Sequence, residues 1–120
     1  MENIKRVAII SHNPTTDQGE WVTLPLELKA IWGNISPYIL NVEDEIRPIL
    51  DWLDNQDPDI VWVQGEMTAV AVIWNWCRSR RVEAVVATTN REVEEQQLPD
   101  GSVAKKAVFK HCLFRRVPFP

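Results

Sequence analysis

Short apolar runs alternate along the chain with longer stretches of helical character. Residues 7–10 and 60–63 are unbroken apolar runs, and residues 82–87 form a similar run with one charged position. Short runs of this kind are typical of strands that are buried on both faces of a parallel sheet. Residues 21–24 predict a further strand, so the pattern indicates a sheet of short, mostly parallel strands.

Two of the intervening stretches predict helices that follow strands. Residues 67–77 are almost wholly apolar, interrupted only by Thr68 and Asn75, and are long enough for a helix. Pro25 stands at a favoured position for opening a helix over residues 26–32. Strand and helix therefore succeed each other in the order of a βαβ unit.

Residues 41–55 predict the clearest surface helix. The acidic residues 43–45 lie at its amino end, where the helix dipole favours negative charge. Apolar residues then recur at helical spacing. Pro48 lies in the first turn if the helix begins near Asp44, and it would kink a helix that begins earlier.

The C-terminal part of the chain changes character. Residues 91–98 are polar, residues 99–102 form a strong turn signal and residues 103–117 are β-prone, which predicts a hairpin. We therefore expect a single α/β domain over residues 1–120. It is predicted to be a small Rossmann-like, three-layer domain with a mostly parallel sheet and a C-terminal β-hairpin.

Composition narrows the possible partners and location. The net charge of −4 argues against binding of long nucleic acid through a basic surface. No apolar run reaches the roughly 20 residues that cross a bilayer, so no membrane association is expected. Without a signal peptide or a disulfide framework, a cytoplasmic location is expected, with Cys77 and Cys112 as reduced core residues.

Six tryptophans are unusual for a chain of this size. Trp74 and Trp76 lie two positions apart on one predicted helix and therefore point in different directions. A helix that is apolar on more than one face needs cover from more than one side. We therefore expect a homodimer.

Polar clusters follow three of the predicted strands. In an open α/β sheet, ligands bind beyond the carboxyl ends of the strands, so these clusters mark one candidate site. Their hydroxyl, amide and basic groups suit a phosphate or the edge of a nucleotide base. The clusters are Ser11-His12-Asn13, Gln64-Gly65-Glu66 with the nearby Thr68, and Thr88-Thr89-Asn90-Arg91.

His12 is suited to proton transfer, because imidazole titrates near neutral pH. Arg91 or Lys110 can neutralise a phosphate, and in a regular strand Lys110 and His111 point to opposite faces. Purely structural interpretations stay open: a histidine bonded to backbone at a turn, threonines that cap, a glycine that only permits a turn. We expect no metal and no cofactor, because zinc-ligand spacing, a Walker loop, a dinucleotide glycine motif and a nucleophile elbow are all absent.

Five segments, in order, resemble the successive blocks of a small CRISPR-associated, Csx-type family that is counted among the ancillary ring nucleases of type III CRISPR systems. The chain is shorter than the family pattern between Gln18 and Leu24, so its first crossover helix is expected to be reduced. The segments are VAIISHNPTTDQ, LPLELKAIWGNISP, VWVQGEMTAVAVIWNW, VVATTNRE and PDGSVAKKAVFKHCLFRRV.

The resemblance implies a Rossmann-like, CARF-like homodimer that binds cyclic oligoadenylate, with cyclic tetra-adenylate as the expected ring. It also implies metal-independent cleavage: a ribose 2′-hydroxyl attacks the adjacent phosphate and leaves a 2′,3′-cyclic phosphate, which ends the antiviral signal. Two alternatives stay open, a cyclic-nucleotide sensor or sponge without turnover and a module that docks on a larger component.

The resemblance assigns residue roles as follows. The expected catalytic residues are His12, Lys110 and His111, and the expected ligand-binding residues are Ser11, Asn13, Gln18, Gln64, Gly65, Glu66, Thr68, Thr88, Thr89 and Arg91.

Overall fold

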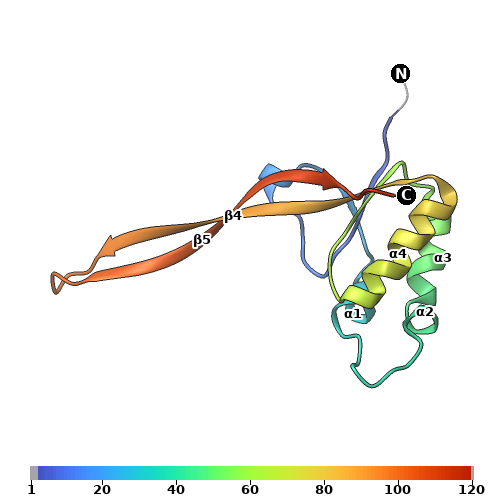
Figure 1. Ribbon diagram of the computed structural model, residues 1–120, viewed down its shortest axis with the longest axis horizontal. Coiled ribbons are helices and arrows are strands. Elements are labelled where there is room, and N and C mark those ends of the chain that lie inside the picture. Colours follow the sequence, from blue (N-terminus) through green and yellow to red (C-terminus); the bar gives the residue numbers. More distant parts are fainter. Residues whose placement is uncertain (1–2, 120) are drawn as a thin grey trace.

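The computed structural model describes residues 3–119, which form one five-stranded sheet with helices and a projecting hairpin (Figure 1). The elements, in chain order, are β1 (Arg6–Ile9), the 3₁₀ turn η1 (Thr16–Gln18), β2 (Val22–Thr23), α1 (Leu26–Gly33), α2 (Val42–Glu45), α3 (Arg47–Gln56), β3 (Ile60–Val63), α4 (Met67–Arg80), β4 (Glu83–Gln97) and β5 (Val103–Arg116).

The sheet has the strand order β2-β1-β3-β4-β5. β1 pairs in parallel with β2 and β3, and β3 pairs in parallel with β4, whereas β4 and β5 are antiparallel. The parallel sheet predicted for the body is confirmed, but the longest pairing is the antiparallel one, so the sheet is mixed. The strand order reverses between β1 and β3, and the crevice beyond their carboxyl ends is the usual ligand site of such sheets.

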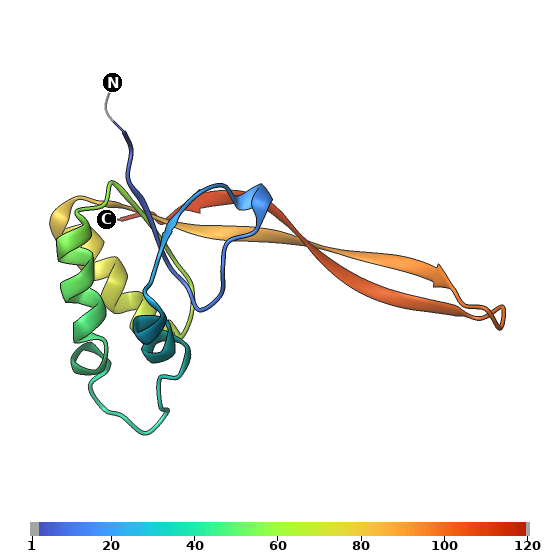
Figure 2. The same ribbon diagram turned by 180° about the vertical axis from the view of Figure 1, so that it is seen from behind.

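One face of the sheet is covered by helices. Val7, Ile9, Val61 and Val63 alternate onto this face, where they pack in one buried cluster with residues of α1, α3 and α4. The two views of the ribbon show the helices together on this side of the sheet (Figures 1 and 2). This apolar layer is the main core of the protein.

The three-layer arrangement predicted from the sequence is wrong. The opposite face carries a separate small cluster, centred on Trp62 and covered by Trp21 and Phe114 without any α-helix among the described residues. The crossover from β1 to β2 contains only η1, capped by Thr15, so it provides no second helical layer. β5 returns directly from β4 as a hairpin and needs no crossover helix. We call this second surface the helix-free face.

The predicted hairpin is confirmed and forms a long arm that projects from the body (Figures 1 and 2). Glu94 lies opposite Lys106, and Glu95 lies opposite Lys105, so charges of opposite sign face each other across the arm. The strand predicted at residues 82–87 continues to Gln97 as β4. The sequence had placed Thr88 to Arg91 beyond the end of a strand, and this prediction is wrong. They lie within β4, because its pairing with β5 continues through them.

Two further predictions need correction. The helix expected over residues 41–55 is divided at Ile46 into α2 and α3, because Pro48 is accommodated in the first turn of a new helix and not inside a longer one. Cys77 is buried as predicted, but Cys112 is exposed. No helix within residues 3–119 is long and apolar enough to cross a membrane.

Candidate functional site

Gln64 joins several elements at the crevice beyond β3. Its N–H donates to the carbonyl of Ile9 at 3.2 Å, and its own carbonyl accepts from Trp32 Nε1 at 2.9 Å. Its side-chain Oε1 accepts from the indole of Trp62 and from the N–H of Ala87, the latter at 3.3 Å. Gln64 thereby links β1, β3, β4 and α1 through its backbone and its Oε1. Its side-chain NH₂ takes no part in these hydrogen bonds and remains as the group that can donate to a ligand.

Gly65 is required by packing. A Cβ atom at this position would lie 2.7 Å from Trp32 Nε1, the same nitrogen that donates to the carbonyl of Gln64. The glycine therefore lets the turn after β3 approach the buried indole ring of α1. This close approach alone explains why a glycine stands at position 65, and no ligand is needed to explain it.

Glu66 and Thr68 form the amino-terminal cap of α4. The Glu66 carboxylate accepts from the Thr68 hydroxyl and from the N–H groups of Thr68 and Ala69. These hydrogen bonds, the Thr68 hydroxyl foremost, hold the pKa of Glu66 below its usual range. A hollow of about 820 Å³ lies beside this cap, against the loop that connects α1 to α2. The packing of Gly65 and the hydrogen bonds of Glu66 therefore directly support a structural role for Gly65, Glu66 and Thr68.

The cluster after β1 is exposed. Asn13 Oδ1 accepts from Lys29 Nζ at 2.6 Å, which fixes the loop to α1. Ser11 and His12 lie on the surface, and the His12 ring meets the edge of Trp62 with a centroid distance of 6.2 Å and an interplanar angle of 83°. His12 is therefore held against the helix-free face.

Both histidines of the chain lie on one aromatic cluster. The Trp62 and Phe114 rings are 4.9 Å apart between centroids, and His111 lies 4.9 Å from Phe114 on the other side. Trp21 contacts both Trp62 and Phe114, at 5.5 and 4.9 Å. The rings thus run from His12 through Trp62 and Phe114 to His111. We call these four residues and Trp21 the histidine face.

A β-bulge places His111 on this face. Leu113 pairs with Thr88 and His111 pairs with Thr89, so Cys112 is an extra residue in β5. The Thr88 hydroxyl donates to the Leu113 carbonyl at 3.1 Å and accepts from the Leu113 N–H at 3.3 Å, which satisfies the backbone beside the bulge. Without the extra residue the alternation of side chains would turn His111 to the opposite face.

The remaining predicted residues divide between the two faces of the arm. Thr89 pairs with His111 and Arg91 follows two positions later, so the alternation of β4 puts both on the side of the histidine face. Lys110 lies on the opposite side, where its ammonium binds the Glu92 carboxylate at 2.9 Å and its pKa is raised by that hydrogen bond and charge. Gln18 closes η1, its Oε1 accepting from the Thr15 N–H at 2.8 Å.

The aromatic members of the histidine face were not identified from the sequence as parts of a site. The available signal was the alternation in β3: Val61 and Val63 face the helices, so Trp62 must face the other way. His111 Nδ1 is buried without a hydrogen-bond partner among the described residues. Within residues 3–119, no three His, Cys, Asp or Glu side chains are grouped so that they could hold a metal ion.

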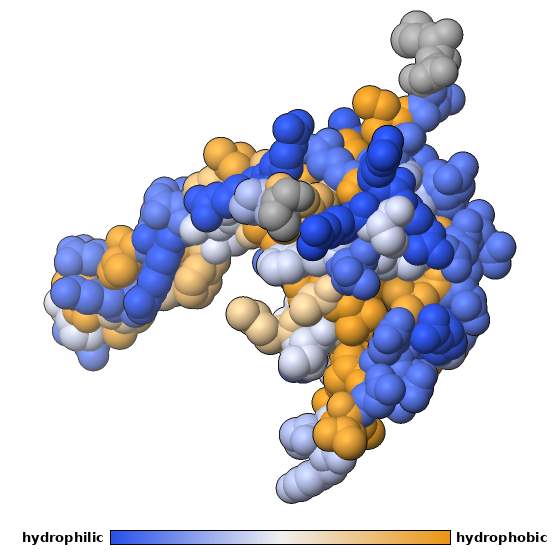
Figure 3. Space-filling view, turned by 45° about the vertical axis from the view of Figure 1, so that its right-hand side comes forward, coloured by the Kyte–Doolittle hydropathy of each residue, from blue (hydrophilic) through white to orange (hydrophobic). Residues whose placement is uncertain are grey.

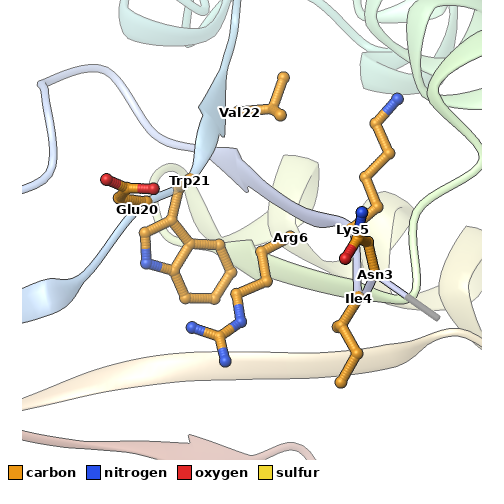
Figure 4. A pocket seen from close by; sticks show the side chains of 7 residues that line it. All are labelled: Asn3, Ile4, Lys5, Arg6, Glu20, Trp21 and Val22. Carbon is orange, nitrogen blue, oxygen red and sulfur yellow. The ribbon is translucent and has the colours of Figure 1, made fainter. Parts of the chain in front are cut away.

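A further hollow shares Trp21 with the histidine face. It measures about 850 Å³ and is bordered by residues 3–6 and by Glu20, Trp21 and Val22, at the amino end of β1 (Figure 4). The Arg6 side chain extends toward Trp21, with its guanidinium carbon 5.9 Å from the ring centroid. None of the residues predicted to bind ligand borders this hollow, so the histidine face and the crevice after β1 and β3 remain the candidate site.

The architecture is that of a small α/β protein with an open, mixed sheet and a long hairpin arm. The chain belongs to the uncharacterized protein MJ1673 family, whose model matches residues 5–115. A relative, "Uncharacterized protein MJ1673" of Methanocaldococcus jannaschii, is 28% identical over 124 residues, covering 93% of this chain and 95% of the relative. No solved structure matches the chain.

Proposed function

We propose that this protein binds a cyclic oligoadenylate on the histidine face and cleaves it to linear products without a metal ion. The observation that carries the proposal is the position of His12 and His111 on one aromatic cluster, with Thr89 and Arg91 on the same side. Residues from the loop after β1 and from β3, β4 and β5 converge there. The resemblance of the sequence to ancillary ring nucleases supports the choice of a cyclic substrate.

The chemistry needs one base and one acid. His12 takes the proton of a ribose 2′-hydroxyl, whose oxygen attacks the adjacent phosphorus while the bond from phosphorus to the 5′-oxygen breaks. His111, which lies beyond Trp62 and Phe114 as seen from His12, gives a proton through intervening water to that leaving oxygen, and the products end in a 2′,3′-cyclic phosphate and a 5′-hydroxyl. Arg91 offsets the charge that develops on the phosphate oxygens. The ammonium of Lys110 is bound to Glu92 on the other side of the arm, so the proposal gives both proton transfers to histidines.

The aromatic rings supply the binding surface for bases. Trp21 and Phe114 are half-buried, so part of each ring is open to a stacked adenine. Stacking of a base on an aromatic side chain contributes about 1–3 kcal/mol and tolerates any base. Ser11, Asn13 and the side-chain NH₂ of Gln64 lie at the neighbouring crevice and are proposed to orient ribose and phosphate.

Cyclic tetra-adenylate is the proposed ring, bound across the two-fold axis of a homodimer in the cytoplasm. A ring with repeated phosphates presents the same groups to two equivalent subunits. In this arrangement each subunit contributes one histidine face. The role of the protein would be to remove the cyclic signal of a type III CRISPR system.

The test is product analysis in the presence of EDTA. Purified protein is incubated with cyclic tetra-adenylate, and products are separated by chromatography and identified by mass. Linear products with a 2′,3′-cyclic phosphate are expected. An intact ring that co-elutes with the protein would instead assign a sensor or sponge, and an intact ring without binding would rule out both nucleotide functions.

A further inference from the structure

A second pocket lies on the helix-covered side of the sheet, between α4 and the base of β5. Its volume is about 440 Å³, and its walls are mainly apolar, with Trp74, Val86, Val117 and Phe119 among them. Figure 3 shows hydrophobic side chains gathered over the helices beside the hollow that separates the body from the arm. We call the pocket between α4 and the C-terminal end of β5 the α4 pocket. It shares none of the residues of the histidine face.

The indole of Trp74 lacks a hydrogen-bond partner. Its Nε1 is buried and makes no hydrogen bond with any described residue. By contrast, the indoles of Trp21, Trp32, Trp62 and Trp76 all donate to protein oxygens. A buried donor without an acceptor is costly, and in native proteins such groups are nearly always satisfied. Trp74 borders the α4 pocket, so a ligand acceptor there would satisfy this donor once the indole turns toward it.

Two arginines of the pocket are also unpaired. Arg78 and Arg115 border it, are exposed, and form no ion pair within the described part of the chain. Their neighbours differ: Arg80 binds Asp54, and Arg116 binds Glu83, each at 2.7 Å. In a chain of net charge −4, these two arginines leave positive charge uncompensated beside the apolar walls of the α4 pocket.

We propose that the α4 pocket binds a small organic anion with a flat apolar body. The body packs against Trp74 and Phe119, the anionic group pairs with Arg78 and Arg115, and an acceptor on the ligand takes the Trp74 N–H. The volume lies within the range of pockets for small molecules, about 300–1,000 Å³. Guanidinium groups are well suited to carboxylates, sulfonates and phosphates. The proposal does not depend on cleavage at the histidine face.

The test uses 8-anilinonaphthalene-1-sulfonate, which combines a flat aromatic body with one anionic group. Its fluorescence is titrated with the full chain and with Arg78→Gln, Arg115→Gln and Trp74→Phe, after thermal unfolding has shown that each variant is folded. Each arginine variant is expected to bind about tenfold more weakly, and Trp74→Phe, which keeps the ring but loses the N–H, about fivefold. Arg47→Gln, an exposed arginine of α3, is the matched control and is expected to bind like the wild type.

Competition experiments test the apolar body and the anionic group of the proposed ligand separately. Naphthalene-1-sulfonate is expected to displace the probe, whereas inorganic phosphate at the same concentration is not, because it lacks the apolar body. Equal affinity in all variants, or displacement by phosphate alone, would overturn the proposal. Neither result would bear on cleavage of a cyclic nucleotide.

Discussion

His111 and Phe114 are three positions apart on β5, yet their rings lie on one face of the sheet, 4.9 Å apart between centroids. In a regular strand, residues three positions apart point to opposite faces. The bulge at Cys112 shifts the register by one residue and brings them together. The candidate site therefore depends on one extra residue in a strand.

The bulge can be removed in two ways that have opposite consequences. Insertion of one alanine between Thr88 and Thr89 gives Cys112 a partner and turns His111 to the other face, so cleavage is expected to fall at least a hundredfold. Deletion of Cys112 also makes the strands regular but leaves His111 opposite Thr89, so cleavage is expected to persist. Circular dichroism checks that both variants fold. Equal activity of the two folded variants would contradict the assigned register.

Gly65 tests the packing of the turn after β3. Gly65→Ala is expected to lower the free energy of unfolding by about 1–3 kcal/mol, because the new methyl group would lie 2.7 Å from Trp32 Nε1. Gly101→Ala is the matched control: its φ is +85° and nothing lies within 4 Å, so only backbone strain of about 1 kcal/mol is expected. Urea unfolding measures both. A larger loss at Gly101 than at Gly65 would contradict the close approach to Trp32.

Glu66 predicts how stability depends on pH. Its pKa is lowered in the folded state by hydrogen bonds from Thr68 and Ala69. Its stabilising contribution is therefore complete above the pKa of an unfolded-chain glutamate, about 4.3, and is lost as the pH falls through the lower folded value. The melting temperature of Glu66→Gln is expected to lie below that of the wild type at pH 7, with the difference shrinking toward pH 3. A difference that stays constant over this range would argue against the cap.

The two cysteines are expected to react very differently. Burial raises the pKa of the Cys77 thiol to about 12, whereas Cys112 is exposed in the bulge. Iodoacetamide at pH 8 is therefore expected to label Cys112 alone in the folded protein, and both thiols in denaturant. Peptide mass analysis identifies the labelled residue. Labelling of Cys77 at a comparable rate without denaturant would show that α4 is not packed as described.

The sequence predicted most of the body because its signals were local. The apolar run 60–63 coincides with β3, and the apolar stretch that begins at Met67 coincides with the start of α4. Both elements could be located because the burial of such runs follows from their composition alone. The short crossover around η1 was also expected. The lack of a second helical layer on the described sheet was not expected, because the number of layers depends on which face of the sheet each connection covers.

The candidate site was only partly predictable for a similar reason. His12 and Gln64 lie after strands and were found from that position. Thr88 and Arg91 were assigned to a strand end, because nothing in the local pattern shows that β4 continues into the arm. The position of His111 depends on a bulge, which is set by pairing with a distant strand and by the Thr88 hydroxyl. Long-range register of this kind leaves no mark within a single segment.

The central claim is that His12 and His111 perform the two proton transfers on one ring bound at the histidine face. The most direct measurement is single-turnover cleavage of cyclic tetra-adenylate, with binding measured in parallel, for His12→Ala, His111→Ala and the surface control Glu43→Ala. We expect a rate loss of about 10²–10⁴-fold for each histidine variant, with dissociation constants within a few-fold of the wild type and an unchanged control. Histidine variants that cleave at the wild-type rate, or that change only the affinity, would contradict it.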